Sequence, residues 1–301
     1  MKYLVTGGAG FIGSHVVDRL VRDGHEVIVI DNEAADSNEK FYWNTKAKNF
    51  KYDIQDYESI KDLFAGVHTV FHLAAESRIQ PAINNPIHAA QVNFVGTCTV
   101  LQCAREAGCD RVVYSSTSSA YGLKNTPPLN EEMKSDCLNP YSVTKVGGES
   151  LCKMYNDLFG LKTITFRYFN VYGDRQPLKG EYAPVIGLFL RQKKSGQPMT
   201  IVGDGTQKRD FTFIEDVVEA NICASITQDA AAFGQVFNIG SGVNYSILEL
   251  VSLIGGDYIH IDPRIGEAHT SLANISKATR LLKWEPKGSL KEWLKNEQAA
   301  K

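Results

Sequence analysis

Tyr141 and Lys145 are the two residues of this chain whose types and spacing most directly suggest acid–base chemistry. They lie four positions apart in a segment of helical period that follows Pro140, so both side chains fall on one helix face. An ammonium beside a phenol favours the ionised phenol and lowers its pKa from about 10 toward the range of a general base. A packed tyrosine beside a solvated lysine is the alternative for an isolated pair, so the interpretation depends on what lies nearby.

A run of hydroxyl side chains precedes this pair in the sequence. Ser115-Ser-Thr-Ser-Ser-Ala-Tyr-Gly122 follows directly on an apolar run at 111–114. Ligands of open α/β sheets bind beyond the carboxyl ends of the strands, and a hydroxyl both donates to and accepts from a substrate oxygen. Thr117, Ser118 and Ser119 are therefore candidate site residues. The alternative is a serine-rich loop that hydrogen-bonds its own backbone, and Tyr141 weighs against it.

A glycine-rich loop follows the first apolar run. Gly7-Gly-Ala-Gly-Phe-Ile-Gly13 opens a helical segment, and its glycines allow backbone N–H groups to approach a pyrophosphate at a helix N-terminus. The second apolar run ends at Asp31, 18 residues after Gly13, where a carboxylate can bind an adenosine ribose. Asn32 and Glu33 follow it in place of an arginine, so the pattern predicts NAD rather than NADP. An ordinary strand-to-helix turn with a surface aspartate is the alternative.

The elements that must position these residues show in the alternation of short apolar runs with longer segments of helical period. Continuous apolar runs are typical of strands buried on both faces of a parallel sheet. The predicted fold class is therefore α/β, with a Rossmann-type doubly wound parallel sheet. The expected strands are 3–6, 26–30, 68–73, 111–114, 163–166 and 236–239, and the expected helices are 14–22, 57–64, 86–107, 141–159 and 214–225.

The alternation weakens after about residue 170, where prolines and glycines punctuate short segments. Residues 1–170 are expected to form the NAD-binding Rossmann domain. Residues 171–301 are expected to form mainly a smaller C-terminal α/β substrate-binding part. Residues 211–240 carry one more helical and one more strand-like segment, so they are expected to return to the first domain.

Composition argues against several classes of protein. The 301 residues carry a net charge of −2, which is too balanced to favour nucleic-acid binding. No apolar run approaches the ~18 residues that a membrane-spanning helix needs. Six cysteines without a Cys-x-x-Cys pair favour reduced thiols in a cytoplasmic protein. No metal site is expected, because metal-ligand spacing is lacking among the candidate histidines, which are His72, His88, His260 and His269.

Together these motifs resemble the extended short-chain dehydrogenase/reductase family, and within it the NAD-dependent sugar-nucleotide epimerases and dehydratases. The resemblance spans nearly the whole chain. The matching segments are 6–15, Asp31-Asn32, Asp53-Ile54, 72–75, Asn93, 115–122, Tyr141-x-x-x-Lys145, 167–173, 203–205, 209–211 and 264–267.

The resemblance implies roles for particular residues. Tyr141 would be the base, Lys145 would bind the nicotinamide ribose and lower the Tyr141 pKa, and Thr117 or Ser118 would hold the sugar 4-oxygen. The implied NAD-binding residues are Gly7, Gly10, Phe11, Ile12, Gly13, Asp31, Asn32, Asp53, Ile54, Leu73, Ala74, Ala75, Asn93, Tyr141 and Lys145. The implied substrate-binding residues are Ser119, Asn170, Tyr182, Arg209, Arg264, Glu267 and Ser271, with Asn170 and the two arginines facing a diphosphate and Glu267 facing the uridine ribose.

Departures within the family narrow the activity that the resemblance implies. Dehydratases carry an Asp-Glu pair where this chain has Ser118 and Ser119, which disfavours dehydration. Segments 167–176 and 180–186 are most similar to UDP-hexose 4-epimerases, particularly those acting on N-acetylhexosamines. Ser271 is expected where a tyrosine would restrict the room beside the sugar's C2 group. The expected activity is interconversion of UDP-N-acetylglucosamine and UDP-N-acetylgalactosamine through a transient 4-keto sugar.

Other possibilities remain open at this point. The chain could be another nucleotide-sugar enzyme of the same family, such as a dehydratase, a reductase or a UDP-glucose 4-epimerase. It could also be an NAD-sensing protein without activity, although such proteins usually lack the pair at 141 and 145. Helices 86–107 and 141–159 resemble those that pair across a twofold axis in this family, which implies a homodimer.

Overall fold

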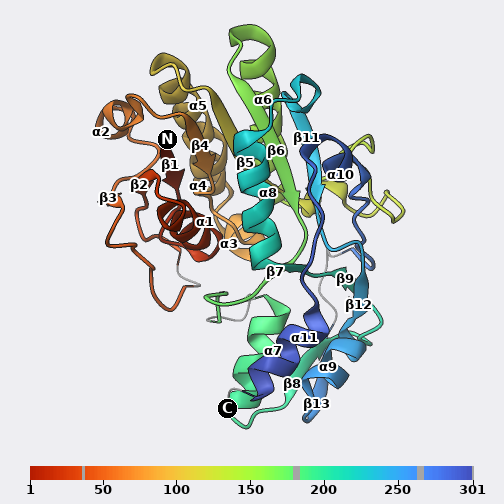
Figure 1. Cartoon of the computed structure of the whole chain (residues 1–301). Coiled ribbons are helices and arrows are strands. Elements are labelled where there is room, and N and C mark those ends of the chain that lie inside the picture. The colour runs from red at the N-terminus through yellow and green to blue at the C-terminus, as the bar shows by residue number, and fades with distance from the viewer. Residues whose placement is uncertain (36–37, 179–183, 263–267, 300–301) are drawn as a thin grey trace.

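The protein is built around a parallel sheet with helices on both sides (Figure 1). The computed structural model describes residues 1–35, 38–178, 184–262 and 268–299, and within them the sheet has seven strands in the order β11-β6-β5-β4-β1-β2-β3. All of its pairs are parallel, as predicted. The strands are β1 (Lys2–Thr6), β2 (Glu26–Ile30), β3 (Lys48–Phe50), β4 (Thr69–His72), β5 (Arg111–Thr117), β6 (Lys162–Tyr168) and β11 (Gln235–Ile239).

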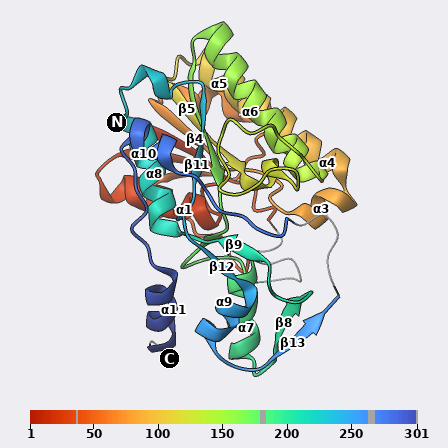
Figure 2. The ribbon, with the colours of Figure 1, turned by 90° about the vertical axis from the view of Figure 1, so that its right-hand side faces the viewer.

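The two faces of the sheet bury alternate residues of each strand. Tyr3 and Val5 of β1 pack in one core, and Leu4 between them packs in the other. This explains why the strands read as continuous apolar runs. Figure 2 shows the sheet between two helical layers. The helices α1 (Phe11–Arg22), α8 (Ile214–Ile226) and α10 (Ser276–Leu282) cover one face, and α5 (Gly96–Glu106) and α6 (Pro140–Phe159) cover the other.

The order of the strands places a switch point beside β1. From β1 the chain runs outward through β2 and β3, and then crosses back to β4 on the other side of β1. The loops that follow β1 and β4 therefore leave in opposite directions, which opens a crevice at the carboxyl ends of these strands. The glycine loop follows β1 directly, so it lies at this crevice.

A smaller part lies below the carboxyl ends of the strands, at the bottom of Figure 1. It has its own core, which includes Phe189, Ile201, Phe211 and Leu250. Its elements are β7 (Val171–Tyr172), α7 (Val185–Lys194), β8 (Met199–Val202), β9 (Lys208–Asp210), β10 (Thr212–Phe213), β12 (Asn244–Ser246), α9 (Ile247–Ile254), β13 (Tyr258–Ile261) and α11 (Leu290–Ala299). Strand β11 instead pairs with β6 in the large sheet, so the chain passes between the two parts more than once.

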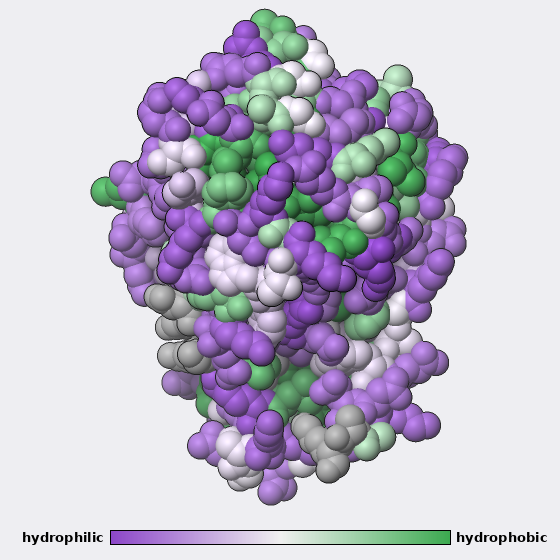
Figure 3. Space-filling view, turned by 60° about the vertical axis from the view of Figure 1, so that its left-hand side comes forward, coloured by the Kyte–Doolittle hydropathy of each residue, from purple (hydrophilic) through white to green (hydrophobic). Residues whose placement is uncertain are grey.

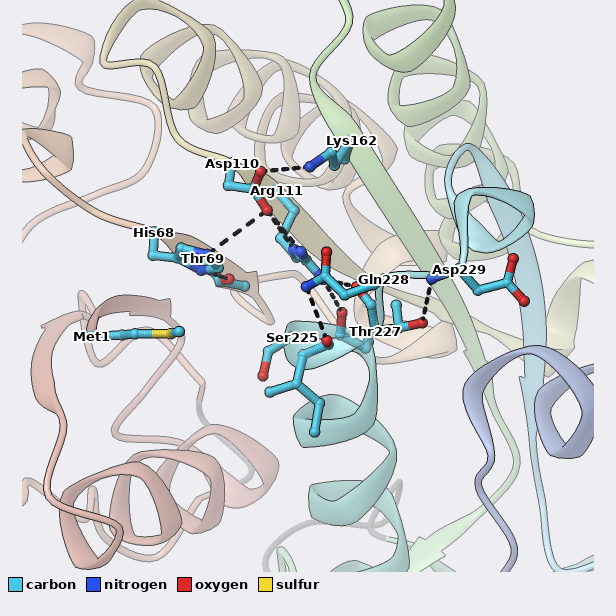
Figure 4. A network of polar contacts seen from close by, with 12 residues as sticks. Met1, His68, Thr69, Asp110, Arg111, Lys162, Ser225, Thr227, Gln228 and Asp229 are labelled. Carbon is cyan, nitrogen blue, oxygen red and sulfur yellow. Dashed lines mark hydrogen bonds and ion pairs between the residues drawn. The ribbon is translucent and has the colours of Figure 1, made fainter.

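A polar network fixes the opposite, amino-terminal edge of the sheet (Figure 4). Asp110, just before β5, accepts hydrogen bonds from Arg111 at 2.8 Å and from Lys162 of β6 at 2.7 Å. The Arg111 side chain is 1% exposed and donates to the carbonyl oxygens of Ala224 and Thr227 at the end of α8. The Arg111 guanidinium thus joins the start of β5 to the end of α8, and Asp110 joins Arg111 to Lys162 of β6. These contacts lie away from the crevice.

Helix α6 lies unusually close to the sheet. A Cβ added to Gly148 would stand 2.2 Å from the Tyr114 hydroxyl of β5, so only glycine allows this approach. The Tyr114 hydroxyl donates to the carbonyl oxygen of Lys145 at 3.3 Å. The helix begins with a capping box in which the Asn139 side chain accepts from the Ser142 backbone N–H. These contacts fix the first turns of α6, where Tyr141 and Lys145 lie.

Several boundaries differ from the expected ones. Helix α1 begins at Phe11 rather than 14. The segment 57–64 divides into α2 (Tyr57–Ile60) and a 3₁₀ turn (Lys61–Phe64). The segment 86–107 contains α4 (Pro86–Ala90), a π turn (Gln91–Val95) and α5 in succession. The short helix α3 (Ile79–Asn84) was not expected.

The face of the molecule in Figure 3 is mainly hydrophilic, with apolar side chains gathered in patches. Within the described ranges, every helix is too short or too polar to cross a membrane. The same residues contain no cluster of three His, Cys, Asp or Glu side chains arranged to hold a metal ion.

Candidate active site

A cavity of about 730 Å³ runs from the glycine loop to the smaller part of the molecule. Its walls come from the carboxyl ends of β1, β4, β5 and β6, from the start of α6, and from α7, β8 and β9. The structure therefore brings together residues that are far apart in the sequence. Those expected at the site that line it are Gly7, Gly10, Phe11, Ile12, Gly13, Asp31, Asn32, Asp53, Ile54, Leu73, Ala74, Ala75, Thr117, Ser118, Ser119, Tyr141, Lys145, Asn170 and Arg209.

The glycine loop is a tight turn that side chains would disrupt. Gly7 has a φ of +68°, and a Cβ there would approach the Ala74 backbone nitrogen to 2.7 Å. A Cβ on Gly13 would lie 2.1 Å from the Gly7 carbonyl oxygen. The loop leads into the N-terminus of α1, where no side chain caps the helix. Free backbone N–H groups and the absence of side chains are what a bound pyrophosphate requires, so the loop fits a dinucleotide.

Asp31 organises the end of the cavity beside β2. Its carboxylate accepts from the backbone N–H of Ala9 at 3.0 Å and from that of Glu33 at 2.8 Å. Burial raises its pKa, and these two hydrogen bonds oppose the rise. Asn32 donates to Asp53 at 2.9 Å, which fixes a second carboxylate nearby. Carboxylates in this place can accept hydrogen bonds from ribose hydroxyls and repel a 2′-phosphate.

A segment after β2, residues 38–44, passes over the glycine loop, and we refer to it as the strap. The backbone N–H of Tyr42 donates to the Ala9 carbonyl oxygen at 2.8 Å, and Phe41 lines the cavity. The Asn44 amide donates to Asp18 of α1 at 2.7 Å. The strap therefore joins the glycine loop and α1 and narrows the opening beside them.

Tyr141 is half-buried at the start of α6 and lines the cavity. Burial raises its pKa, whereas a hydrogen bond with Thr117 and the positive charge of Arg78 lower it. Lys145, which was expected to lower this pKa, is not among the groups that shift it. The charges and hydrogen bonds that favour the phenolate come instead from β5 and from the segment after β4.

Lys145 is 3% exposed, and its ammonium lies 4.7 Å from the centre of the Tyr114 ring. Burial lowers its pKa to about 7. A group with this pKa is about half neutral near neutral pH, which is a physical reason for its weak effect on Tyr141. The Lys145 side chain still lines the cavity on the same helix face as Tyr141, so it can donate to a ligand hydroxyl.

The hydroxyl cluster lies at the carboxyl end of β5, but its first three residues, Ser115, Ser116 and Thr117, belong to the strand, which was expected to end at 114. The Thr117 Oγ1 atom accepts from the Ser119 backbone N–H at 3.1 Å and begins a 3₁₀ turn at Ser118–Tyr121. Thr117 thus satisfies the backbone and also hydrogen-bonds Tyr141. Ser118 and Ser119 line the cavity beside it.

Asn93 does not line the cavity, although it was expected to bind the cofactor. It is 1% exposed and lies in the π turn, where its amide accepts from the Glu76 N–H at 2.8 Å and donates to the Glu76 carbonyl oxygen at 3.0 Å. It also donates to Thr144 of α6. Asn93 therefore fixes the segment after β4, residues 73–78, which does line the cavity.

The expected substrate residues are placed only in part. The Asn170 amide, which lines the cavity, donates to the Asp210 carbonyl oxygen at 2.8 Å, and Arg209 of β9 lines the same wall. Ser271 does not line it, and its hydroxyl accepts from the Asp210 N–H at 3.3 Å. Tyr182, Arg264 and Glu267 lie outside the described residues.

The cavity residues that were not expected from the sequence include two further groups. Glu76 and Arg78 lie in the segment after β4, where no recognisable motif marks them. The second group is a largely apolar wall from the smaller part. In the sequence, only the apolar residues of 185–189 indicate part of this wall. Its residues include Val185, Phe189, Val202, Phe211 and Ile247.

Comparison with known proteins agrees with this geometry. Residues 3–240 match the model of the family described as "NAD dependent epimerase/dehydratase family". A UDP-glucose 4-epimerase of Mycolicibacterium smegmatis is 36% identical over 304 residues, which are 97% of this chain and 96% of the relative. The crystal structure of a UDP-glucose 4-epimerase with UDP-glucose from Thermotoga maritima matches with a TM-score of 0.93 and 34% identity, over 100% of both chains.

A second similar solved structure contains a UDP-sugar with a different substituent. It is a UDP-N-acetylglucosamine 4-epimerase from Methanobrevibacter ruminantium in complex with UDP-N-acetylmuramic acid. It matches with a TM-score of 0.91 and 29% identity, over 97% of this chain and 95% of that one. Similar folds of this kind therefore serve more than one UDP-sugar.

Proposed function

Because the chain belongs to the NAD-dependent epimerase/dehydratase family, we propose that it inverts C4 of a UDP-hexose, and that this hexose is N-acetylglucosamine or N-acetylgalactosamine. The observation that carries the proposal is the shared cavity, in which Tyr141, Thr117 and the glycine loop line one continuous space. In this proposal residues 1–170 and 211–240 bind the cofactor, and the rest of 171–301 binds the sugar nucleotide.

Each residue has a defined task in the proposed reaction. NAD supplies a hydride acceptor and donor, so that C4 is oxidised and then reduced without net redox change. Tyr141, as phenolate, would take the proton of the 4-hydroxyl while C4 is oxidised and would return it to the 4-oxygen while C4 is reduced from the opposite face of the sugar ring. Thr117 or Ser118 holds the 4-oxygen, and Lys145 donates to the nicotinamide ribose. Asn170 and Arg209, from the described residues, face the diphosphate, for which a guanidinium fork is well suited.

The N-acetyl substituent is the finer part of the proposal. Ser271 hydrogen-bonds both neighbours of Arg209, through Lys208 and Asp210, so it lies directly beside the strand that lines the cavity. A tyrosine there would extend toward the sugar. The Ser271→Tyr variant is expected to lose turnover of N-acetylhexosamines while it retains turnover of UDP-glucose.

The test is C4 inversion followed by NMR with the purified protein and no added nucleotide cofactor. UDP-N-acetylglucosamine and UDP-glucose are supplied separately, with Tyr141→Phe as the inactive variant. We expect inversion of the N-acetyl sugar, and loss of turnover by at least about 100-fold in the variant, because a general base contributes that much or more. A stable deoxy-keto product or net release of reduced cofactor would instead indicate a dehydratase or reductase. Inversion of UDP-glucose alone would support 4-epimerisation of a UDP-hexose but overturn the N-acetyl substrate.

We propose further that the protein is a cytoplasmic homodimer. All six cysteines are unpaired thiols, which suits a reducing compartment. The outer faces of α4, the π turn and α6 carry exposed apolar side chains, of which Ile87 is 71%, Val95 52% and Leu158 68% exposed. Sedimentation is expected to give a dimer, with dissociation in a Val95→Glu/Leu158→Glu variant. Ile226→Glu on α8 is the matched control, because Ile226 is equally exposed apolar surface elsewhere.

A further inference from the structure

Arg78 is a cation in the cavity wall to which the proposed reaction assigns no substrate contact. It follows β4 and forms the N-cap position of α3. Its Nε atom is buried and has no hydrogen-bond partner among the described residues. A buried guanidinium nitrogen without an acceptor is costly, so a ligand in the cavity that supplies an acceptor would remove this cost.

The surroundings of Arg78 place this nitrogen near the reacting end of the cavity. Its charge is close enough to lower the pKa of Tyr141, and the charge of Tyr141 in turn affects Arg78. Glu76 and Arg78 both line the cavity. The backbone carrying them is held by Asn93, which hydrogen-bonds both the N–H and the carbonyl of Glu76. The guanidinium therefore stands on a fixed segment rather than on a free loop.

The charge of Glu76 restricts the kind of acceptor that suits Arg78. The Glu76 carboxylate accepts from the Arg78 backbone N–H at 3.3 Å. Burial lowers the Arg78 pKa, and the charge of Glu76 opposes this shift. A second carboxylate, such as that of a uronate sugar, would be repelled by Glu76. A neutral carbonyl oxygen meets no such repulsion and still accepts a charge-assisted hydrogen bond.

We propose that Arg78 is a specificity-determining residue that donates from its guanidinium to the carbonyl oxygen of the substrate's acetamido group. This inference rests on the proposed function, since it assigns a further contact in the same cavity. A plain hexose offers only a hydroxyl in place of the acetamido group. The guanidinium would then lose its carbonyl acceptor, and the enzyme would discriminate against that sugar.

The experiment compares wild type with Arg78→Gln and Arg78→Lys, all loaded with cofactor. The measured quantities are kcat/KM for UDP-N-acetylglucosamine, UDP-glucose and UDP-glucuronate, and the calorimetric Kd of each sugar nucleotide relative to that of UDP. In Arg78→Gln the ratio of kcat/KM for UDP-N-acetylglucosamine over UDP-glucose is expected to fall roughly 10- to 100-fold, the range for a hydrogen bond to a charged group. Arg78→Lys keeps the charge but not the planar fork, so its ratio should fall between the two.

The matched control is Arg280→Gln, an exposed arginine of α10 outside the cavity wall. It should leave the ratio unchanged. An equal loss for all three sugars would overturn the proposal, because it would indicate a contact with the diphosphate or a purely structural role. A larger loss for UDP-glucuronate would overturn it in favour of a carboxylate ligand.

The binding measurement separates this inference from the proposed function. If wild type binds UDP-N-acetylglucosamine but inverts no sugar, the proposed function fails, and the Kd ratios alone decide the role of Arg78. A weaker relative Kd for the acetamido sugar in Arg78→Gln would still support the contact. Binding of this sugar no tighter than UDP-glucose in wild type would overturn it.

Discussion

The side chains around Tyr141 show how much its ionisation depends on its neighbours. Burial alone keeps a phenol protonated, and here it raises the Tyr141 pKa. The Thr117 hydrogen bond and the Arg78 charge act in the opposite direction. Thr117 belongs to β5 and Arg78 to the segment after β4, so the base is activated only in the folded cavity.

Removing the Thr117 hydroxyl should therefore weaken the base. Thr117→Val keeps the shape of the side chain but loses the hydrogen bond that lowers the Tyr141 pKa. Since the phenolate is the active form, kcat rises with pH, and this rise should move to higher pH in the variant. If the Tyr141 pKa becomes one pH unit higher, the phenolate present at neutral pH falls about tenfold. The pH profile of kcat checks this, and a reduced kcat with an unmoved profile would contradict it.

Lys145 should make the stability of the protein depend on pH. Its pKa is lowered to about 7 in the folded protein and lies near 10.4 in an unfolded chain. Between these values the unfolded state binds more protons, so the free energy of unfolding rises with pH, by at most about 1.4 kcal/mol per pH unit. Below pH 7 Lys145 is protonated in both the folded and the unfolded state, so its contribution to the free energy of unfolding no longer changes with pH.

Urea unfolding of the cofactor-free protein between pH 7 and 9.5 measures this dependence. Lys145→Met should be more stable at pH 7 and should lose most of the rise. Lys153→Met, an exposed position of the same helix, should retain it. Parallel curves for wild type and Lys145→Met would contradict the buried, depressed lysine.

Sequence reasoning found the cavity residues that carry a motif and missed those that do not. Gly7, Gly13 and Asp31 follow a pattern of spacing that backbone geometry demands, so they could be predicted. Arg78 lies in Ser-Arg-Ile-Gln, which has no such pattern, and its importance comes from burial and from an absent partner, both of which are tertiary facts. Asn93 could be predicted as a site residue from its matching position. The sequence could not predict that it acts by hydrogen-bonding the Glu76 backbone.

At the level of elements, prediction succeeded where one physical rule dominated. Strands buried on both faces read as apolar runs, so the strands other than β3 within the large sheet were found. Strand β3 is a largely exposed edge strand of three residues, without an apolar run. Helices α7, α9 and α11 were not predicted, because glycines and prolines interrupt the segments around them. The π turn within 86–107 was also missed, since a bulge of this kind leaves the helical period nearly intact.

Arg111 gives a test of the amino-terminal edge as a structural element. Its guanidinium bonds Asp110 and two carbonyls of α8, and it is 1% exposed. Arg111→Met keeps the apolar stem but removes the guanidinium donor from the Ala224 and Thr227 carbonyls, and it leaves Asp110 with Lys162 as its donor. Breaking a buried pair costs about 3–5 kcal/mol, and exposure of Asp110 places the expected loss at the lower end.

Denaturant unfolding measures this loss, and sugar-nucleotide KM provides the contrast. The KM should stay unchanged, because the network lies at the edge of the sheet away from the cavity. Arg22→Met, at an exposed arginine of α1, should alter neither quantity. A raised KM in Arg111→Met would show that the two edges are coupled.

At the scale of the whole molecule, the cavity lies between two separately packed cores. The residues proposed to bind the cofactor lie on the side of the large sheet, and the wall from the smaller part closes the other side. A ligand that bridges both parts stabilises the arrangement by mass action. The carboxylates of Asp31 and Asp53 at the far end should restrict this effect to a dinucleotide without a 2′-phosphate.

Cofactor-stripped protein should therefore respond differently to the two dinucleotides. At concentrations near 100 times its Kd, NAD is expected to add about 2.7 kcal/mol to the free energy of unfolding. NADP at the same concentration should add clearly less. Thermal unfolding with each dinucleotide measures this, and equal changes in melting temperature would contradict the role given to Asp31.

The close approach of α6 to the sheet at Gly148 has a consequence for reading mutational data. Even alanine would force its Cβ to within 2.2 Å of the Tyr114 hydroxyl, and any adjustment would move the helix that carries Tyr141 and Lys145. In a saturation scan scored by growth or turnover, Gly148 should tolerate as little as the base itself. Gly148 does not line the cavity, so a scan of activity alone would wrongly count it as an active-site residue. A parallel measurement of protein abundance would separate positions needed for catalysis from positions needed for folding.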